Sequence, residues 1–163
     1  MKIYIYLLVV LCFLSPYSYS GNVTGNCISY SKEGRNVTFH LSDSSAVQLQ
    51  LCSPSVVRVW FSPDGKLQRG TPSFAVINEE LEDVGTVQVD EQNACYEMFT
   101  PKLRIRVNKA PFSLQIFDKY QKLLFSDYAD KGHVSEGTRK VEYKTLRRDE
   151  HFFGLGEKTG KLD

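Results

Sequence analysis

The sequence predicts an all-β protein, an antiparallel β-sandwich. Turn-forming residues recur about every ten positions, the runs between them alternate apolar and polar residues, and leucine-rich or alanine-rich helical stretches are scarce. A chain of 163 residues has room for one compact domain with its own core and no room for two. About ten short strands over about 140 residues fit two packed antiparallel sheets better than a small closed barrel.

Residues 1–20 are predicted to be a signal peptide outside the folded domain. Lys2 provides a short positive start, Ile3–Leu14 is an apolar run, and Ser18 and Ser20 are small residues of the kind that precede the cleavage site. The apolar run is well short of the roughly 20 residues that a membrane-spanning helix needs. We therefore expect export, cleavage after Ser20, a domain at residues 21–163 and no transmembrane segment after cleavage.

The first half of the domain predicts four strands. Cys27–Ser31 and Val37–Leu41 flank a Lys-Glu-Gly-Arg turn and form a hairpin. Residues 47–51 alternate valine or leucine with glutamine, which indicates a strand with one buried and one solvated face. Val56–Phe61 is almost continuously β-branched and aromatic, so we expect it to be a central strand.

The second half predicts a meander after a long connection at residues 66–82, which holds one short strand around 74–77. The meander strands are each bounded by Gly, Pro, Asn or Asp, and they are Val84–Val89, Ala94–Phe99, Leu103–Val107, Phe112–Phe117 and Leu123–Phe125. A polar connection is expected at 127–140 and a last strand near 141–146. Arg104 and Arg106 alternate with apolar residues, so they are expected on the face away from the core, where they need no functional explanation.

Charge and cysteine content exclude several partners. The 20 lysines and arginines balance 19 acidic residues, so nothing draws the chain to nucleic acid. Cys27, Cys52 and Cys95 remain after signal cleavage, and their spacing matches no zinc pattern, so neither a metal nor another cofactor is expected. Export permits a disulfide between Cys27 and Cys52, but each cysteine is equally interpretable as a small buried hydrophobic residue.

Three segments carry a resemblance to a known family. They are Val57-Arg58-Val59-Trp60-Phe61-Ser62-Pro63, Thr100-Pro101-Lys102-Leu103-Arg104-Ile105, and the stretch from Asp149 to Gly160 with its Phe-Gly-Leu-Gly-Glu-Lys-Thr-Gly sequence. Together, in this order and spacing, they resemble the N-terminal domain of family 31 glycoside hydrolases over roughly residues 35–163. The resemblance implies a galactose mutarotase-like sandwich, also called a supersandwich, that precedes a catalytic (β/α)8 barrel.

The resemblance also implies what the chain lacks. The family's catalytic aspartates lie on barrel strands, the nucleophile within a Trp-x-Asp-Met-Asn-Glu run, whereas Trp60 is followed by Phe-Ser. A barrel needs about 200 residues or more. We therefore expect no catalytic residue here, a domain that is incomplete at its C-terminal end, and a parent enzyme that is a retaining α-glucosidase. The expected partners are that barrel and the α-glucoside or oligosaccharide that the intact enzyme binds.

The glycine-rich turn is the one candidate site. In the family it lies near the mouth of the barrel, so Gly154, Gly156, Glu157 and Lys158 are expected close to substrate. A phosphate-binding loop would place glycine immediately before its lysine, whereas Glu157 precedes Lys158 and would repel phosphate.

Two other functions remain open. A free-standing exported carbohydrate-binding or interaction module would use aromatic faces against sugar rings. Its candidates are Trp60, Phe61, Tyr96, Phe99, Tyr120 and Tyr128.

A mutarotase-like epimerase would need a histidine and a carboxylate facing each other across a sugar. His40 lies on a predicted strand, His133 in a polar loop and His151 after two acidic residues. All three are expected to be surface or structural residues. The acidic run Glu79, Glu80, Glu82 and Asp83 is interpreted as a solvated surface.

Overall fold

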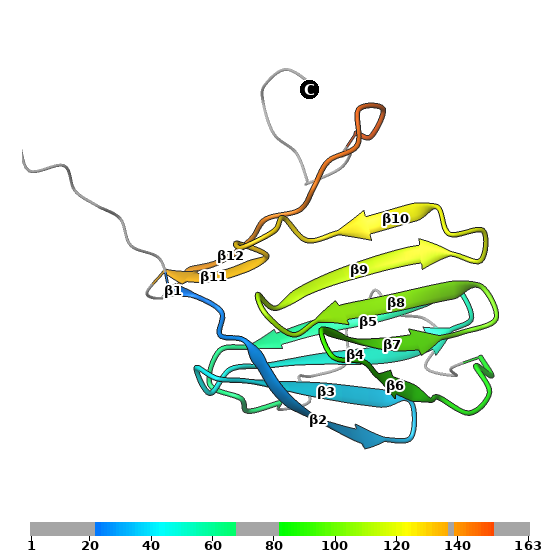
Figure 1. Cartoon of the computed structure of the whole chain (residues 1–163), viewed down its shortest axis with the longest axis horizontal. Helices are drawn as coiled ribbons and strands as arrows, with labels where there is room; N and C mark the ends of the chain where they lie inside the picture. The colour runs from blue at the N-terminus through cyan, green and yellow to red at the C-terminus, as the bar shows by residue number, and fades with distance from the viewer. Residues whose placement is uncertain (1–21, 68–81, 137–138, 152–163) are drawn as a thin grey trace, which may run out of the picture.

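The chain folds into antiparallel β-sheets. A computed structural model describes residues 22–67, 82–136 and 139–151, and there it contains twelve strands and no helix (Figure 1). No helix in this part of the chain is long and apolar enough to cross a membrane. The all-β prediction is confirmed. The predicted signal peptide at 1–20, the strand expected around 74–77 and the candidate turn residues 154–158 lie outside the described residues.

One layer of the sandwich is a four-stranded sheet with the order β2-β3-β4-β5. Its strands are β2 (Cys27–Glu33), β3 (Asn36–Leu41), β4 (Ala46–Ser53) and β5 (Val56–Ser62). Along β4 the residues alternate between buried and half-buried, as the sequence period predicts. The prediction of a central β5 is wrong, because β5 is the last strand of this sheet.

The other layer is a five-stranded meander with the order β10-β9-β8-β7-β6. Its strands are β6 (Val89–Glu91), β7 (Cys95–Phe99), β8 (Leu103–Asn108), β9 (Ser113–Asp118) and β10 (Leu123–Ser126). The strand predicted from Val84 begins only at Val89. Gly85 adopts a left-handed φ of 70° and donates its N–H to the side chain of Asp83, which makes a turn where an extended strand was expected.

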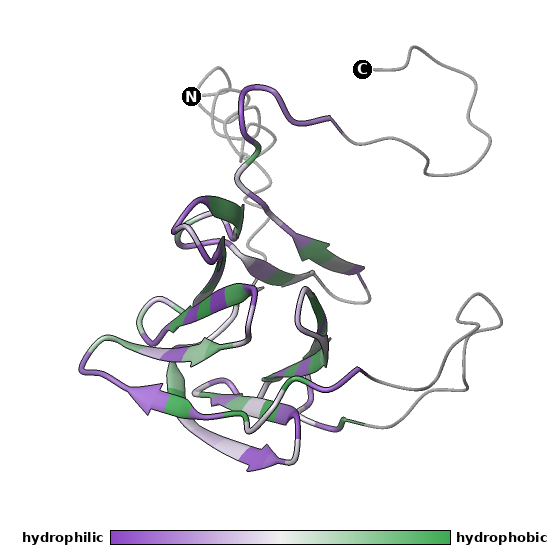
Figure 2. Cartoon of the chain, turned by 90° about the vertical axis from the view of Figure 1, so that its right-hand side faces the viewer, coloured by the Kyte–Doolittle hydropathy of each residue, from purple (hydrophilic) through white to green (hydrophobic). Residues whose placement is uncertain are grey.

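The core lies between the two layers. Buried residues of β3, β4, β7 and β8 form one continuous cluster, and green and purple bands alternate along the strands in Figure 2. At its centre the fully buried ring of Phe39 lies 6.3 Å from Tyr30 and 5.6 Å from Tyr96, measured between ring centroids. These aromatic contacts join the two layers, since Phe39 belongs to β3 and Tyr96 to β7.

A small third sheet adjoins one end of the sandwich. It has the order β1-β11-β12 and comprises β1 (Asn22–Val23), β11 (His133–Glu136) and β12 (Arg139–Glu142). The predicted polar connection at 127–140 therefore contains a strand and the start of another. The strand predicted near 141–146 is shorter than expected, because β12 ends at Glu142. Beyond it, Lys144 forms an isolated antiparallel bridge with Asp127.

The cysteines are thiols. Cys27, Cys52 and Cys95 form no disulfide in the described residues, and Cys27 and Cys95 are buried. Burial raises the pKa of Cys27 to about 11, so this thiol stays protonated and unreactive at neutral pH. The interpretation as small buried hydrophobic residues therefore describes Cys27 and Cys95 better than a Cys27–Cys52 disulfide.

Candidate functional site

His133 is buried where the third sheet meets the two layers. Only 1% of its surface is exposed, and its ring lies between Phe61 at the end of β5 and Phe112 just before β9, with centroid distances of 5.2 and 6.0 Å. The prediction that His133 lies in a polar loop is wrong, because it begins β11. His40 does lie exposed on its strand, with its Nε2 3.1 Å from the Ser31 hydroxyl.

Asp127 binds this histidine from the chain just after β10. Its carboxylate accepts the backbone N–H of Leu114 at 2.8 Å and the Lys144 ammonium at 2.7 Å, and it lies 3.5 Å from His133 Nε2. Gly132 makes room for the carboxylate, since a Cβ at residue 132 would approach the Asp127 side chain to 3.0 Å. Asp127 therefore joins β9, β11 and the segment after β12.

Glu142 completes a cluster of four charges. Its carboxylate lies 3.5 Å from His133 Nδ1 and 3.3 Å from Lys144 Nζ. Desolvation opposes charge on His133, but Asp127 and Glu142 outweigh it and raise the pKa of the imidazole. Contact with His133 lowers the pKa of Glu142 to about 2. The two carboxylates are balanced by Lys144 and a protonated His133, and we call these four residues the His133 cluster.

The geometry of the His133 cluster does not suit sugar epimerisation. Both ring nitrogens of His133 face carboxylates directly at 3.5 Å, and neither the imidazole nor the Asp127 carboxylate is exposed to solvent. No sugar ring fits between an acid and a base that already touch. The His133 cluster instead fastens the third sheet to the sandwich.

We expect the His133 cluster to make stability depend on pH. The raised pKa of His133 contributes stability that is complete below its unfolded value near 6.5 and is lost as the pH rises through the folded pKa. The lowered pKa of Glu142 contributes stability above about 4.5 that is lost on acidification toward 2. Urea midpoints measured from pH 3 to 9 should therefore peak between about pH 4.5 and 6.5.

The matched variants for that measurement are His133→Gln and His40→Gln. Only His133→Gln should abolish the decline above pH 6.5, because His40 is solvent-exposed. A midpoint that stays constant from pH 5 to 9 in the unmodified chain would contradict the predicted role of His133.

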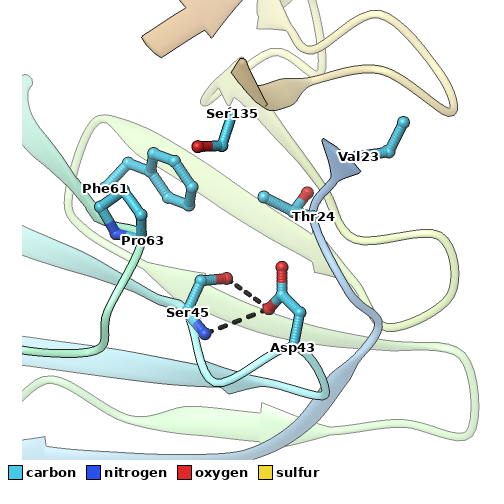
Figure 3. Close-up of a pocket in the computed structure, with 7 residues that line it drawn as sticks. All are labelled: Val23, Thr24, Asp43, Ser45, Phe61, Pro63 and Ser135. Carbon is cyan, nitrogen blue, oxygen red and sulfur yellow. Dashed lines mark hydrogen bonds between the residues drawn. The ribbon is translucent and has the colours of Figure 1, made fainter. Parts of the chain in front are cut away.

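A pocket of about 440 Å³ opens beside the His133 cluster (Figure 3). It is lined by Val23, Thr24, Asp43, Ser45, Phe61, Pro63 and Ser135. One carboxylate oxygen of Asp43 accepts the backbone N–H and the hydroxyl of Ser45, at 3.1 and 2.6 Å. Partial burial would raise the pKa of Asp43, but these hydrogen bonds lower it, so the side chain is an anion.

Four exposed apolar side chains lie on β10 and in the segments that follow β10 and β12, and we call them the apolar patch. They are Leu124, Tyr128, Tyr143 and Leu146. The backbone N–H of Tyr128 donates to the carbonyl of Tyr143, so the two tyrosines are cross-strand neighbours. Tyr128 is 54% exposed and Leu146 56%. In Figure 1 the segment after β12 continues from here toward the C-terminus.

The two arginines of β8 lie away from the core as predicted, but they have a partner. Both bind the carboxylate of Glu97, a buried residue on the outer face of β7, and both guanidinium groups lie over the ring of Phe117. These bonds lower the pKa of Glu97 although its burial opposes this. The network is structural: it covers the outer face of the meander.

Across residues 22–67, 82–136 and 139–151, no group of three or more His, Cys, Asp or Glu side chains is arranged to hold a metal ion.

The profile of the glycosyl hydrolase 31 N-terminal galactose mutarotase-like domain matches residues 46–163. The chain belongs to this family. The match agrees with the two-layer antiparallel architecture and includes the turn residues Gly154, Gly156, Glu157 and Lys158, whose closeness to substrate stays a prediction.

The chain is also similar to a curated protein and to solved structures. The GH31 dextranase of Flavobacterium johnsoniae, solved with isomaltotriose and with glucose, is 56% identical with a TM-score of 0.78 over 86% of this chain. Alpha-glucosidase 2 of Bacillus thermoamyloliquefaciens is 30% identical over 85% of this chain. The cycloalternan-forming enzyme of Listeria monocytogenes, 19% identical with a TM-score of 0.66, shares the fold. The chain spans 17% of the dextranase and of the α-glucosidase.

Proposed function

We propose that this family 31 sandwich is the non-catalytic N-terminal part of an α-glucosidase-like glycoside hydrolase. It supports a catalytic (β/α)8 barrel and, through Gly154, Gly156, Glu157 and Lys158, partly lines the sugar site of that barrel. The intact enzyme hydrolyses α-linked glucosides with retention of configuration. The similarity to a dextranase and an α-glucosidase, of which the chain spans 17%, supports this assignment.

The observation that carries the proposal is the apolar patch. Contiguous exposed apolar side chains mark interaction surfaces in soluble proteins. Leu146 precedes Gly154 by eight residues, a distance of at most about 28 Å in extended chain. The occupant we assign to the patch is the barrel, which in this proposal also meets the turn that follows Leu146 in the chain.

A fusion tests the docking surface. This chain would replace the matching part of the Flavobacterium dextranase, and heat unfolding would be followed by calorimetry. The fusion should unfold in one transition, whereas Tyr128→Asp with Tyr143→Asp should separate the sandwich transition from the barrel transition, because two charges would be buried at the interface. Tyr120→Asp, at an exposed turn outside the patch, is the matched control and should leave one transition.

A double variant that still unfolds in one transition at the unmodified temperature would contradict barrel docking at this surface. Separate transitions already in the unmodified fusion would contradict it as well.

We propose further that residues 1–20 direct export and are removed. Expression in a secreting host should give a mature protein whose N-terminal sequence starts at Gly21, as Edman degradation would show. A secreted protein that retains Met1, or a protein that stays in the cytoplasm, would contradict this.

A free-standing carbohydrate-binding module is the second candidate. The observation that favours it is the pocket beside the His133 cluster, which is built from residues of this chain alone.

A further inference from the structure

The pocket of Figure 3 is lined by both polar and apolar side chains. Three hydroxyl side chains and one carboxylate supply the polar groups, from Thr24, Asp43, Ser45 and Ser135. Val23, Phe61 and Pro63 supply the apolar surface. Its volume of about 440 Å³ lies within the range of small-molecule sites, roughly 300–1,000 Å³.

Asp43 is held in place as a hydrogen-bond acceptor. One of its carboxylate oxygens is fixed by the Ser45 N–H and hydroxyl, and the backbone of Gly25 also hydrogen-bonds the carboxylate. The second oxygen points away from Ser45, toward the side of the pocket that carries Thr24 (Figure 3). The lowered pKa of Asp43 keeps it ionised at neutral pH. A ligand hydroxyl that donates to this oxygen would form a charge-assisted bond without reorganising the turn.

Phe61 is likewise held in place. Its ring packs against His133 at 5.2 Å between centroids, and the same side chain lines the pocket. The opening is bordered by β1, whose position depends on β11, because Val23 pairs with Val134 and the N–H of Thr24 donates to the carbonyl of His133. The His133 cluster thus positions the Phe61 ring and Thr24 relative to each other.

These features select the class of ligand. An anion is repelled by the Asp43 carboxylate, which has no cationic side chain beside it among the lining residues. A calcium ion needs six to eight oxygen ligands, whereas Asp43 is the one carboxylate among the lining residues. A pyranose ring matches this lining, because its hydroxyl groups donate to carboxylate and hydroxyl oxygens while its C–H face packs on an aromatic ring.

We propose that this pocket binds a pyranose unit of a neutral oligosaccharide. The site needs only residues of this chain, so it goes beyond the proposed role as a support for a barrel. Sugar binding is tested on this chain alone and barrel docking on the dextranase fusion, so either proposal can fail while the other holds.

The test is a titration of the ¹⁵N-labelled 163-residue chain with isomaltotriose, followed by NMR. Saturable shifts are expected at the amides of Thr24, Ser45 and Ser135, with a millimolar dissociation constant. Asp43→Asn keeps the oxygen that caps Ser45 but replaces the other by an amide, and should weaken binding about tenfold. Thr24→Val, which removes one hydroxyl, should weaken it about fivefold.

Asp118→Asn is the matched control. Asp118 caps a turn through one carboxylate oxygen in the same way, accepting the N–H groups of Tyr120 and Lys122 outside the pocket. This variant should bind as the unmodified chain does, and circular dichroism should show all three variants folded.

Three results would overturn the proposal. They are the absence of saturable shifts at the pocket, unmodified affinity in a folded Thr24→Val or Asp43→Asn protein, and shifts of the same amides by calcium chloride but not by isomaltotriose.

Discussion

Asp127→Ala is expected to lower the free energy of unfolding by about 3–5 kcal/mol, the cost of removing one partner from a buried ion pair. The carboxylate is fully buried and accepts bonds from the Leu114 N–H and from Lys144. Without it, the protonated ring of His133 loses one of two counter-charges, and the Leu114 N–H loses its acceptor. We expect the third sheet to detach from the sandwich before the core unfolds.

Urea denaturation at pH 6 would measure the loss for Asp127→Ala. Asp90→Ala, at an exposed carboxylate on β6, is the control and should change the free energy by less than about 0.5 kcal/mol. A loss below about 1 kcal/mol for Asp127→Ala would show that the His133 cluster does not hold the third sheet.

Phe39→Ala should cost a similar amount, about 3–5 kcal/mol, for a different reason. The ring is fully buried and packs against both Tyr30 and Tyr96, so its removal leaves a cavity at the contact between the two layers. Rigid strands on both sides limit how far the cavity can collapse. Unlike Asp127→Ala, this loss should not vary with pH between 5 and 8, because the Phe39 side chain has no ionisable group.

The matched control for Phe39→Ala is Phe99→Ala, because Phe99 is 48% exposed at the end of β7. It should cost less than about 1 kcal/mol in the same denaturation experiment. Equal losses for the two variants would contradict the placement of the core at Phe39.

The sandwich could be predicted because strands that bury one face alternate apolar and polar residues along the sequence. This alternation is clear in β4 and in β8, and both strands lie where they were expected. The position of β5 could not be predicted in the same way. A continuous β-branched and aromatic run favours a strand with both faces covered, but it does not give the order of strands in a sheet. On β5 Arg58 is exposed, and its guanidinium carbon lies 4.9 Å from the centroid of the Trp60 ring.

The third sheet and the His133 cluster escaped prediction because their buried residues are polar. A strand that buries His133 and Val134 shows no apolar alternation, and the segment after Asp127 therefore resembles a loop. The ion pairs of the cluster join residues up to 17 positions apart, so only the fold brings them together. Glu97 was also missed because it is a buried polar residue, and its partners are two arginines of the next strand.

The family could be predicted from short segments because it is the identity and order of their residues, and not their hydrophobic pattern, that distinguish the family. The resemblance carried by the stretch from Asp149 to Gly160 is confirmed by the family profile over residues 46–163. The pocket at Asp43 and Phe61 had no such signal. Its residues come from the ends of β1 and β5 and the residues that follow them, from β11 and from the turn before β4, and no single segment contains more than two of them.

The catalytic rate of the dextranase fusion tests most directly whether this sandwich supports a family 31 sugar site. We predict that the fusion with this chain hydrolyses dextran at a rate within about tenfold of the unmodified dextranase, a difference of about 1.4 kcal/mol in transition-state stabilisation. The same enzyme without any sandwich should be inactive. A folded fusion that binds dextran but does not hydrolyse it, or full activity of the enzyme without a sandwich, would contradict the account.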